Sequence, residues 1–414
     1  MSYKTISSSF GENIKVTISG GSHEPHIGVE VQGLPEGIII YTEELYSFIQ
    51  RRAPGNNAFT TSRRELDIPE FITGVRTSVG TDFAKSDITE SATTSTDFTV
   101  NNTQVPGASS GQIAEATIAE TAKILITTGE PLKAIIKNTN TRSSDYVSLR
   151  DIPRPGHADY TARIKYVDTV NMAGGGPFSA RMTAPLCIVG GIALQYLKTK
   201  GIHIGAHIRS IGGVQGIGFD PVNVDLHQLE NLKTSVFPCL DNNQEKLMQQ
   251  EILKAKEELD SVGGVVEAAI VGLPAGLGGP MYDGVESKLA PILFGIPAVK
   301  GVEFGNGFEA STLRGSQNND PFTIDNNTIK TTTNNHGGIL GGITSGMPLI
   351  CRLAFKPTPS IGMAQQSVNI SNMQPETLQI QGRHDPCVAV RAVPIVEAAL
   401  AVGILDLLFH NINK

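Results

Sequence analysis

The chain has 414 residues, 40% of them hydrophobic and 18% charged, so it is long and apolar enough to bury a sizeable core. Its net charge of −7 argues against a general nucleic-acid binder and predicts that anion binding is confined to local sites. The four cysteines are scattered without a Cys-x-x-Cys pair, and the polar N-terminus lacks the apolar segment of a secretory signal. We therefore expect a reduced, cytoplasmic protein with neither zinc nor disulfides and with no nucleic-acid or membrane partner.

Hydrophobic alternation predicts strands, in chain order, at residues 15–19, 27–32, 132–137, 265–271 and 349–355. Helical periodicity predicts helices at residues 42–52, 179–198, 242–262 and 394–409. The apolar stretch 386–409 is broken by charged residues and a proline, which indicates a buried helix rather than a membrane span. Residues 76–122 are rich in Thr, Ser, Asn and Asp and predict a polar insertion in an otherwise single domain. No Gly-x-Gly-x-x-Gly follows the first strand, so a dinucleotide-binding Rossmann fold is not supported.

The segment 382–387, Gly-Arg-His-Asp-Pro-Cys, places Arg383, His384 and Asp385 on consecutive positions just before the last predicted helix. A guanidinium beside an imidazole and a carboxylate is suited to binding an anion next to a proton donor or acceptor. Ion-pair networks without a catalytic role also produce such clusters.

Two histidine motifs add candidate proton donors. His157 lies with Arg154 in the segment 151–161, where two prolines and a glycine indicate a rigid loop, and an ordinary histidine titrates near neutral pH. His23 follows Ser22 directly after a Gly-Gly pair. A hydrogen-bonded loop histidine and a strand-end turn are the ordinary structural alternatives.

Two cationic motifs add candidate anion contacts. Arg51 and Arg52 end the first predicted helix, where arginines either complement the helix dipole or bind phosphate or carboxylate in a bidentate manner. The segment 356–360, Lys-Pro-Thr-Pro-Ser, combines a cation with two hydroxyls on a stiff backbone. It suits a phosphate-bearing cofactor, although a proline-rich strand exit is equally ordinary.

The order of the motifs is more specific than any one of them. In chain order they are Ser22-His23, Arg51-Arg52-x-Pro54-Gly55, Thr60-Thr61-x-Arg63-Arg64-Glu65, Asn138-Thr139-x-x-Arg142-Ser143-x-Asp145-Tyr146, Arg154 to Thr161, Gly174 to Gly176 with Ser179-Ala180-Arg181, Pro274 to Gly278, Val299 to Glu303, Arg314 to Asn318, Gly337 to Gly342, Lys356-Pro357-Thr358 and Gly382 to Cys387. This series resembles the chorismate synthase family from about residue 10 to the C-terminus, interrupted by the polar insertion.

The resemblance implies a single β-α-β-α sandwich of the α/β (α+β) class that assembles as a homotetramer. Family members convert 5-enolpyruvylshikimate 3-phosphate to chorismate and phosphate by a 1,4-elimination in the shikimate pathway. The reaction needs reduced FMN without net redox change, and NADPH is a candidate reductant. The partner implied is therefore a small phosphorylated carboxylate.

The resemblance also implies roles for individual residues. Those that correspond to catalytic positions are His23, His157, Asp385, Ser22 and Ser179. Those that correspond to cofactor contacts are Ser179, Ala298, Gly341, Lys356, Pro357, Thr358, Pro359, Ser360 and Arg383. Those that correspond to contacts with the substrate's anionic groups are Arg52 and Arg154, and no residue corresponds to a metal ligand.

Several positions depart from the family pattern. The family's Gly-Glu-Ser-His-Gly is Gly20-Gly21-Ser22-His23-Glu24 here, and its Gly-Gly-Gly-Arg-Ser-Ser-Ala-Arg-Glu-Thr continues after the glycines as Pro177-Phe178-Ser179-Ala180-Arg181-Met182-Thr183. The other departures are Ala58, where the family has the second arginine of the first-helix loop, Pro297, where it has an asparagine, and Asn335, where it has a histidine. Since a charge-assisted hydrogen bond contributes roughly 1.5–3 kcal/mol, the loss of two arginines bears on substrate affinity.

Three functions therefore remain open from the sequence. The first is a chorismate synthase with an altered pocket. The second is a paralogous lyase that uses reduced flavin on a related, less anionic substrate. The third is a catalytically silent family member.

Overall fold

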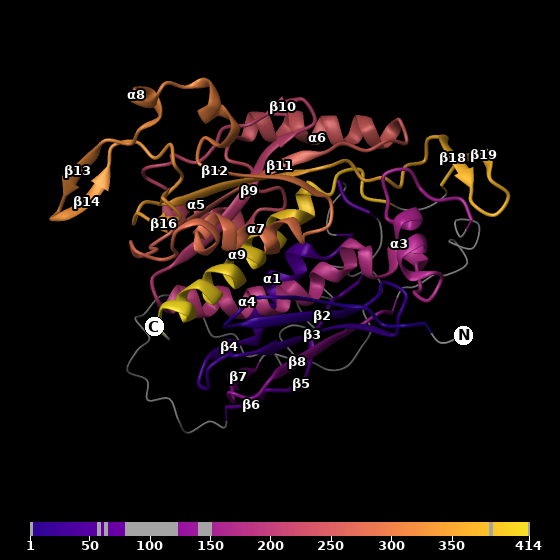
Figure 1. Cartoon of the computed structure of the whole chain (residues 1–414), viewed down its shortest axis with the longest axis horizontal. Helices are drawn as coiled ribbons and strands as arrows, with labels where there is room; N and C mark the ends of the chain where they lie inside the picture. Colours follow the sequence, from indigo (N-terminus) through magenta and orange to yellow (C-terminus); the bar gives the residue numbers. More distant parts are fainter. Residues whose placement is uncertain are drawn as a thin grey trace, which may run out of the picture.

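The computed structural model describes residues 3–55, 59–61, 65–78, 123–139, 151–380 and 384–412. Two five-stranded antiparallel sheets form its framework (Figure 1). The first sheet has the strand order β1-β2-β3-β8-β5. Its strands are β1 (Ser7–Phe10), β2 (Lys15–Gly20), β3 (His26–Gln32), β8 (Leu132–Lys137) and β5 (Glu70–Thr73).

The second sheet has the order β10-β9-β11-β17-β12. Its strands are β10 (Val214–Gln215), β9 (His203–Ile211), β11 (Gly264–Val271), β17 (Leu349–Phe355) and β12 (Val299–Phe304). Residues of β11 alternate between the two faces of this sheet, so that Val266 and Ala268 enter the main core while Ala269 faces a smaller cluster on the outer side. All five strands predicted from alternation are confirmed to within one residue at each end.

A layer of helices separates the two sheets. It consists of α1 (Thr42–Arg52), α4 (Thr183–Thr199), α7 (Val285–Phe294) and α9 (Ala389–Ile412), and α9 contacts both α4 and the second sheet (Figure 1). The outer face of the second sheet is covered by α5 (Leu226–Thr234) and α6 (Asn242–Glu257). The layers therefore follow the order sheet, helices, sheet, helices, which confirms the β-α-β-α sandwich expected from the sequence.

The two most apolar helical segments are enclosed by this arrangement. Residues Ala180–Thr199 and Ala389–His410 are long and apolar enough to cross a membrane by length and composition alone. However, 72% and 89% of their apolar windows are buried inside the fold. Helices that are apolar on all sides occupy the centre of a layered protein, so burial accounts for their composition.

Smaller elements complete the described chain. They are β4 (Ile39–Tyr41), β7 (Ile124–Thr127) and β6 (Val75–Thr77), which form a three-stranded sheet; the hairpins β13 (Phe322–Asp325) with β14 (Thr328–Thr331), β15 (Ile339–Leu340) with β16 (Ile343–Thr344), and β18 (Gln365–Asn369) with β19 (Gln374–Leu378); the helices α3 (Asp159–Tyr166) and α8 (Gly315–Asn318); and the 3-10 turns η2 (Ala173–Phe178), η3 (Ala180–Met182), η4 (Met281–Asp283) and η5 (Gly307–Thr312). The polar stretch 76–122 begins inside β6, and its remainder from residue 79 lies outside the described residues.

The boundaries of three predicted helices differ from the structure. The helix predicted at residues 242–262 ends at Glu257, because Leu259 adopts a left-handed conformation with φ of 59°. The backbone N–H of Asp260 then donates to the carbonyl of Ala255 (2.8 Å), which closes the helix as a Schellman motif. A leucine is an unusual residue at this position, which is why the later Gly-Gly pair gave a misleading end signal.

The last helix begins at Ala389 instead of Pro394. Its first turn forms when the backbone N–H groups of Arg391 and Ala392 both approach the carbonyl of Val388 at 3.1 Å. Pro394 lies inside the helix, where it lacks only the N–H that would bond to the carbonyl four residues earlier. The helix predicted from residue 179 similarly starts as the 3-10 turn η3 and becomes α-helical at Thr183.

A buried carboxylate connects the two ends of the described chain. Asp406 in α9 accepts hydrogen bonds from the backbone N–H groups of Glu12 (3.1 Å), Asn13 (2.7 Å) and Ile14 (2.8 Å). These three residues form the turn between β1 and β2. The first hairpin of the first sheet is therefore held in place by the last helix.

Candidate active site

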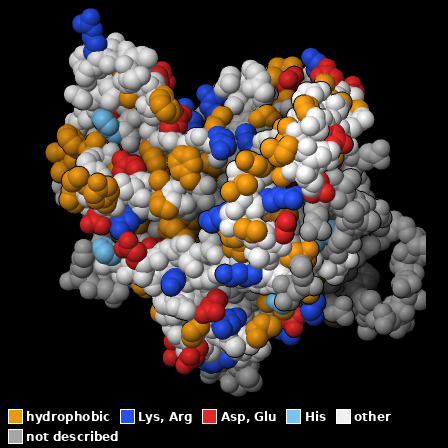
Figure 2. All heavy atoms as spheres, turned by 45° about the vertical axis from the view of Figure 1, so that its right-hand side comes forward, with side chains coloured by type: hydrophobic (Ala, Val, Ile, Leu, Met, Phe, Trp, Pro, Cys, Tyr) orange, Lys and Arg blue, Asp and Glu red, His pale blue; other side chains and the backbone are white. Residues whose placement is uncertain are grey.

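A cavity of about 950 Å³ opens between the β1–β2 edge of the first sheet and the end of β17 in the second. Its wall contains seven cationic side chains and two carboxylates among the described residues. The cations are Arg52, Arg154, Lys165, Arg181, Lys300, Lys356 and Arg391, and the carboxylates are Glu65 and Asp385. Asp67 and Asp159 pair with arginines of the wall and reduce its excess of positive charge without cancelling it. Figure 2 views the molecule from the side on which α3 comes forward, and Lys and Arg side chains lie across the middle of this face.

His157 lies in this wall and is held by its own loop. Its Nδ1 atom is 2.7 Å from Asp159 Oδ1 and 3.1 Å from Nη2 of Arg154. Arg154 is almost buried and donates to both oxygens of Asp159, from Nε and Nη2, at 2.7 Å each. Burial by itself would raise the pKa of Asp159, but the hydrogen bonds from Arg154 and His157 outweigh burial and hold that pKa well below its usual value.

A glycine turn brings Ser22 and His23 close to this loop. The Ser22 hydroxyl donates to the carbonyl of Ala173 (3.0 Å), at the start of η2. A Cβ atom on Gly174 would lie 2.6 Å from the His23 ring, and one on Gly175 would lie 3.2 Å from His157 Nε2. The turn therefore passes directly against both histidines, with φ of 62° at Gly174 and 90° at Gly175, a conformation that favours glycine.

Ser179 lies in the wall at the end of the same turn. Its hydroxyl accepts a hydrogen bond from the backbone N–H of Arg181 (3.3 Å) and so caps η3. The hydroxyl oxygen keeps its own O–H free to orient toward the cavity that the residue lines.

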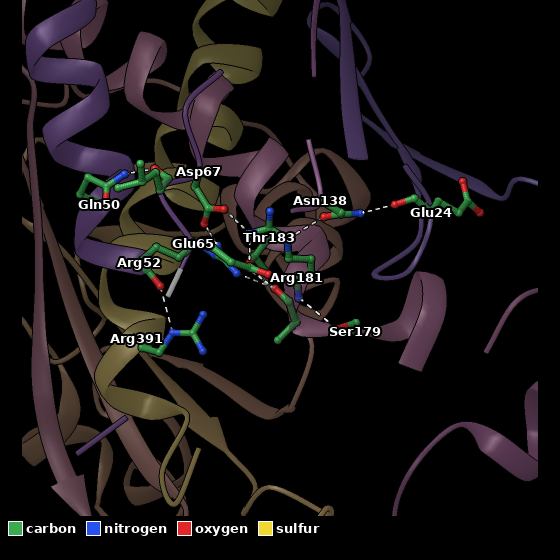
Figure 3. A network of polar contacts seen from close by, with 12 residues as sticks. Glu24, Gln50, Arg52, Glu65, Asp67, Asn138, Ser179, Arg181, Thr183 and Arg391 are labelled. Atoms are coloured by element: carbon green, nitrogen blue, oxygen red, sulfur yellow. Dashed lines mark hydrogen bonds and ion pairs between the residues drawn. The ribbon is translucent and has the colours of Figure 1, made fainter. Parts of the chain in front are cut away.

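Arg52 and Arg181 share a buried carboxylate, Asp67, which ion-pairs with both guanidiniums (Figure 3). Arg52 also donates from Nε to the Thr183 hydroxyl (3.0 Å). Arg181 donates to the Asn138 side-chain oxygen (3.0 Å) and pairs with Glu65 (2.8 Å). Burial lowers the pKa of Arg52 to about 10, with Asp67 acting in the opposite direction, so the guanidinium remains charged at neutral pH.

Asp385 is fixed by contacts on both carboxylate oxygens. Its Oδ1 accepts from the backbone N–H of Thr61 (2.8 Å), and its Oδ2 accepts from Nη1 of Arg391 (2.6 Å). Arg391 also donates from Nε to the carbonyl of Arg52 (2.9 Å), as Figure 3 shows. Burial raises the pKa of the nearby Cys387 thiol to about 12, so this cysteine is not a nucleophile at neutral pH.

The predicted cofactor contacts divide into two groups. Lys356, Thr358, Pro359, Ser360 and Ala298 line the cavity, and the backbone N–H of Lys356 donates to the carbonyl of Ala298 (3.0 Å). Pro357 lies in the same segment but is exposed and not part of the wall. Arg383 lies outside the described residues.

Gly341 is not brought to the cavity within this chain. It lies in the turn between β15 and β16, where the carbonyl of Gly342 accepts from the backbone N–H of Val285 at the start of α7. The cavity instead meets the far end of α7, from Pro291 to Phe294. The two ends of a ten-residue helix are about 15 Å apart, so a contact of Gly341 with this cavity is not supported.

Comparison with known proteins identifies the family. The family model described as chorismate synthase matches residues 14–108 and 115–409. The chain belongs to the chorismate synthase family. Chorismate synthases of Lancefieldella parvula and Dehalococcoides mccartyi are 37% and 40% identical to it, covering 98% and 97% of this chain and 97% and 96% of those proteins.

A crystal structure of chorismate synthase has the same fold. It superposes with a TM-score of 0.67 at 24% sequence identity, covering 97% of this chain and 93% of the other. A third relative, the chorismate synthase of Thermococcus gammatolerans, is 39% identical over 97% of both chains. The family match spans residues 76–108 of the polar stretch as well, so that only residues 109–114 interrupt it.

The departures from the chorismate synthase pattern lie partly in the cavity. Pro177, Phe178, Met182 and Pro297 line it, and Phe178 packs against Tyr166 with ring centroids 6.2 Å apart. These residues replace polar family positions with apolar surface in one part of the wall.

The remaining departures lie elsewhere. Gly21 adjoins Glu24, whose backbone N–H donates to the Gly21 carbonyl (3.0 Å), in the turn that carries Ser22. Asn335 donates to the carbonyls of Gln317 (3.3 Å) and Asn318 (3.2 Å), outside the cavity wall. Ala58 lies outside the described residues.

Four residues of the site were not named as candidate site residues from the sequence, although two of them lie inside the quoted motifs: Asp67, Asn138, Asp159 and Arg391. Asp159 lies two residues after His157, a separation that places both groups at the start of α3. Arg391 was noticed only as a break in an apolar stretch. A cation six residues after Asp385 could have suggested an ion pair, whereas nothing local to Asp67 indicated that two arginines converge on it.

Proposed function

We propose that this protein is a carbon–oxygen lyase of the chorismate synthase type, which eliminates phosphate from 5-enolpyruvylshikimate 3-phosphate to form chorismate. The observation that carries the proposal is the charge of the cavity. Seven cationic side chains line it against two carboxylates, and even when Asp67 and Asp159, which pair with arginines of the wall, are counted, the cations remain in excess by three, although the whole chain has a net charge of −7. A substrate with a phosphate and two carboxylates needs such a concentration of positive charge, since anions leave water only for compensating cations.

The cofactor that the family implies is reduced FMN, and the residues of the cavity fit a phosphate-bearing group. Thr358 Oγ1 is buried without a hydrogen-bond partner among the described residues, beside the cavity that Thr358 lines. The pKa of Lys356 is lowered by burial and then by repulsion from Lys300. A phosphate would accept a hydrogen bond from the hydroxyl and relieve the repulsion between the two lysines. Thr358, Lys356 and Lys300 are therefore the residues we expect to hold it.

When bound, the reduced flavin would supply electron density to the breaking carbon–oxygen bond and recover it afterwards. The chain itself binds the anions, excludes water and manages protons. His157 lines the cavity with Nδ1 held by Asp159, and it can hold or deliver a proton at Nε2. Asp385, fixed by Thr61 and Arg391, presents a carboxylate that can accept one. The cationic wall stabilises the phosphate as it leaves with the electrons of the broken bond.

One observation favours the second candidate, a lyase acting on a less anionic substrate. Phe178 is 38% exposed and lies in the wall with Pro177, where the family pattern has a serine and an arginine. An apolar wall without that guanidinium would accept a substrate that carries one anion fewer. The reduced flavin and the acid–base residues would be used in the same way.

A single assay separates the candidates. Protein incubated anaerobically with dithionite-reduced FMN and 5-enolpyruvylshikimate 3-phosphate is expected to release phosphate and chorismate in equal amounts. The absence of product would refute the first proposal. Tight FMN binding in a failed assay would favour the second candidate, and no FMN binding would favour a silent family member. As a matched pair of variants, His157→Gln is expected to abolish turnover, whereas His227→Gln, on the exposed side of α5, is expected to retain it.

Three further properties belong to the proposal. We infer a homotetramer, which would have a mass of about 176 kDa in light scattering, four times the 44.0 kDa chain. We also infer a cytoplasmic location. Product formed with NADPH and FMN in place of dithionite would show that the protein reduces its own flavin, whereas a strict need for dithionite would show that it does not.

A further inference from the structure

The two ring nitrogens of His157 have different surroundings. Its Nδ1 atom faces Asp159 at 2.7 Å, and its Nε2 atom faces the turn at Gly175, where a Cβ atom would be only 3.2 Å away. Because position 175 is a glycine with φ of 90°, this residue places no side chain against Nε2, and His157 lines the cavity. The ring is thus oriented with one nitrogen committed to the protein and the other available to a ligand.

The contact at Nδ1 determines which nitrogen carries the proton in the neutral ring. An ionised carboxylate can only accept hydrogen bonds, so a distance of 2.7 Å is favourable only if Nδ1 carries a hydrogen. Arg154 Nη2 lies farther from Nδ1, at 3.1 Å, and already donates to Asp159 at 2.7 Å. The tautomer with the proton on Nδ1 is therefore favoured, which leaves the lone pair on Nε2.

We propose that Asp159 is a positioning residue that fixes His157 in the Nδ1–H tautomer and so makes Nε2 the nitrogen that exchanges a proton with the substrate. The catalytic part of this inference rests on the proposed function, whereas the tautomer does not. Asp159 itself does not touch the cavity; it acts through the imidazole.

Arg154 supports Asp159 in this arrangement. All three nitrogens of its guanidinium have partners: Nε and Nη2 donate to Asp159, and Nη1 donates to the Ser360 hydroxyl (3.2 Å). The backbone N–H of Arg154 also donates to Asp159 Oδ2 (3.0 Å). These donors keep Asp159 ionised, and they orient the carboxylate toward the ring. Arg154 thus has a structural partner in addition to the substrate contact expected from the sequence.

The test begins with nitrogen NMR of the purified wild-type protein. Long-range ¹H–¹⁵N correlation of His157, assigned by its absence in His157→Gln and recorded with the ring neutral, is expected to show protonated Nδ1 and unprotonated Nε2. The opposite pattern would overturn the proposal whatever the protein catalyses. The Asp159→Asn variant is expected to shift the ring toward the Nε2–H tautomer, because the neutral amide is a weaker acceptor and Arg154 can then donate to Nδ1.

Kinetics then tests the catalytic consequence. Under the assay conditions given above, Asp159→Asn is expected to lower kcat about 100-fold or more, the usual contribution of a positioned general acid or base, and to change KM much less. A higher KM with unchanged kcat would overturn the proposal, because it would show that Asp159 only holds Arg154 in place for substrate binding. If Asp159→Asn does not fold, the wild-type tautomer still decides the structural part.

Asp151→Asn is the matched control. Asp151 pairs with Arg163 (3.0 Å) in the same segment but does not line the cavity. This variant is expected to keep both the tautomer and kcat. An equal loss of kcat in the two variants would show that the segment is merely sensitive to charge removal and would refute the specific role of Asp159. A wild-type protein that shows the Nδ1–H tautomer but no chorismate formation would refute the proposed function alone.

Discussion

The contact between the glycine turn and His23 can be tested by adding one methyl group. In Gly174→Ala, the new Cβ would lie 2.6 Å from His23 ring atoms and 2.8 Å from the Ser22 hydroxyl, closer than real Cβ contacts. The residue would also have to hold a φ of 62°, which costs a non-glycine residue roughly 1–2 kcal/mol. Gly201→Ala is a matched control, since φ there is 73° but the added Cβ would meet nothing within 4 Å.

The two variants separate backbone strain from overpacking. Gly201→Ala is expected to lower the free energy of unfolding by about 1–2 kcal/mol through strain alone. Gly174→Ala is expected to lose about 1–3 kcal/mol more, because His23 and Ser22 must move to admit the methyl group. Urea unfolding followed by circular dichroism measures both values. Since the displaced groups correspond to catalytic positions of the family, kcat is expected to fall at least about tenfold in Gly174→Ala and to stay unchanged in Gly201→Ala. Equal stability and equal kcat in the two variants would refute the packing of the turn against His23.

Three further predictions concern single ion pairs and carboxylates. Arg391→Met is expected to lower the free energy of unfolding by about 1.5–3 kcal/mol and to lower kcat, because Asp385 loses its charged partner. Millimolar guanidinium should restore part of kcat in this variant and should not change kcat of the wild type. An absence of rescue would contradict this role of Arg391. Asp406→Ala is expected to lower the free energy of unfolding, measured with urea, by about 2–4 kcal/mol, because three backbone N–H groups lose their acceptor. The control Asp220→Ala removes the acceptor of two N–H groups at an exposed turn and should lower it by less than about 1 kcal/mol. Because folding lowers the pKa of Asp159, the stabilisation by this carboxylate is complete above about pH 5 and is lost as the pH falls below the unfolded pKa of 3.8 toward the lower folded pKa. The difference in melting temperature between wild type and Asp159→Asn should therefore shrink on acidification. A constant difference would count against this pKa shift.

The sequence predicted the elements well where a regular pattern ran along them. Strand alternation in β17 and helical periodicity in α1 were sufficient, because each element buries one face repeatedly. β11 was also predicted correctly, although both of its faces are buried. The end of α6 was wrong because Leu259 takes a conformation that local composition does not indicate. The start of α9 was wrong because Pro394 was taken for a helix start, whereas it lies inside the helix.

The candidate site was predictable to the extent that its chemistry lies in short motifs. His157 and Asp385 meet in one cavity as the motif order implied, although 228 residues separate them in the sequence. What could not be predicted is how charges pair across the fold. Asp67 binds two arginines from different segments, and such pairing depends on the packing of the layers and not on spacing along the chain.

The position of α9 has a consequence for how the chain acquires its structure. Asp406 anchors the turn at Glu12, 394 positions earlier in the sequence, and α9 fills the layer on which both sheets pack. α4 packs on the first sheet and against α9, so a nascent chain that has produced the first sheet and α4 would leave the apolar surface between α4 and α9 exposed until the last helix is synthesised. Contacts of such long sequence separation slow folding and prolong the exposure of unpaired surface. We expect the order of synthesis to make this protein dependent on protection during translation, with the cavity among the last features to form.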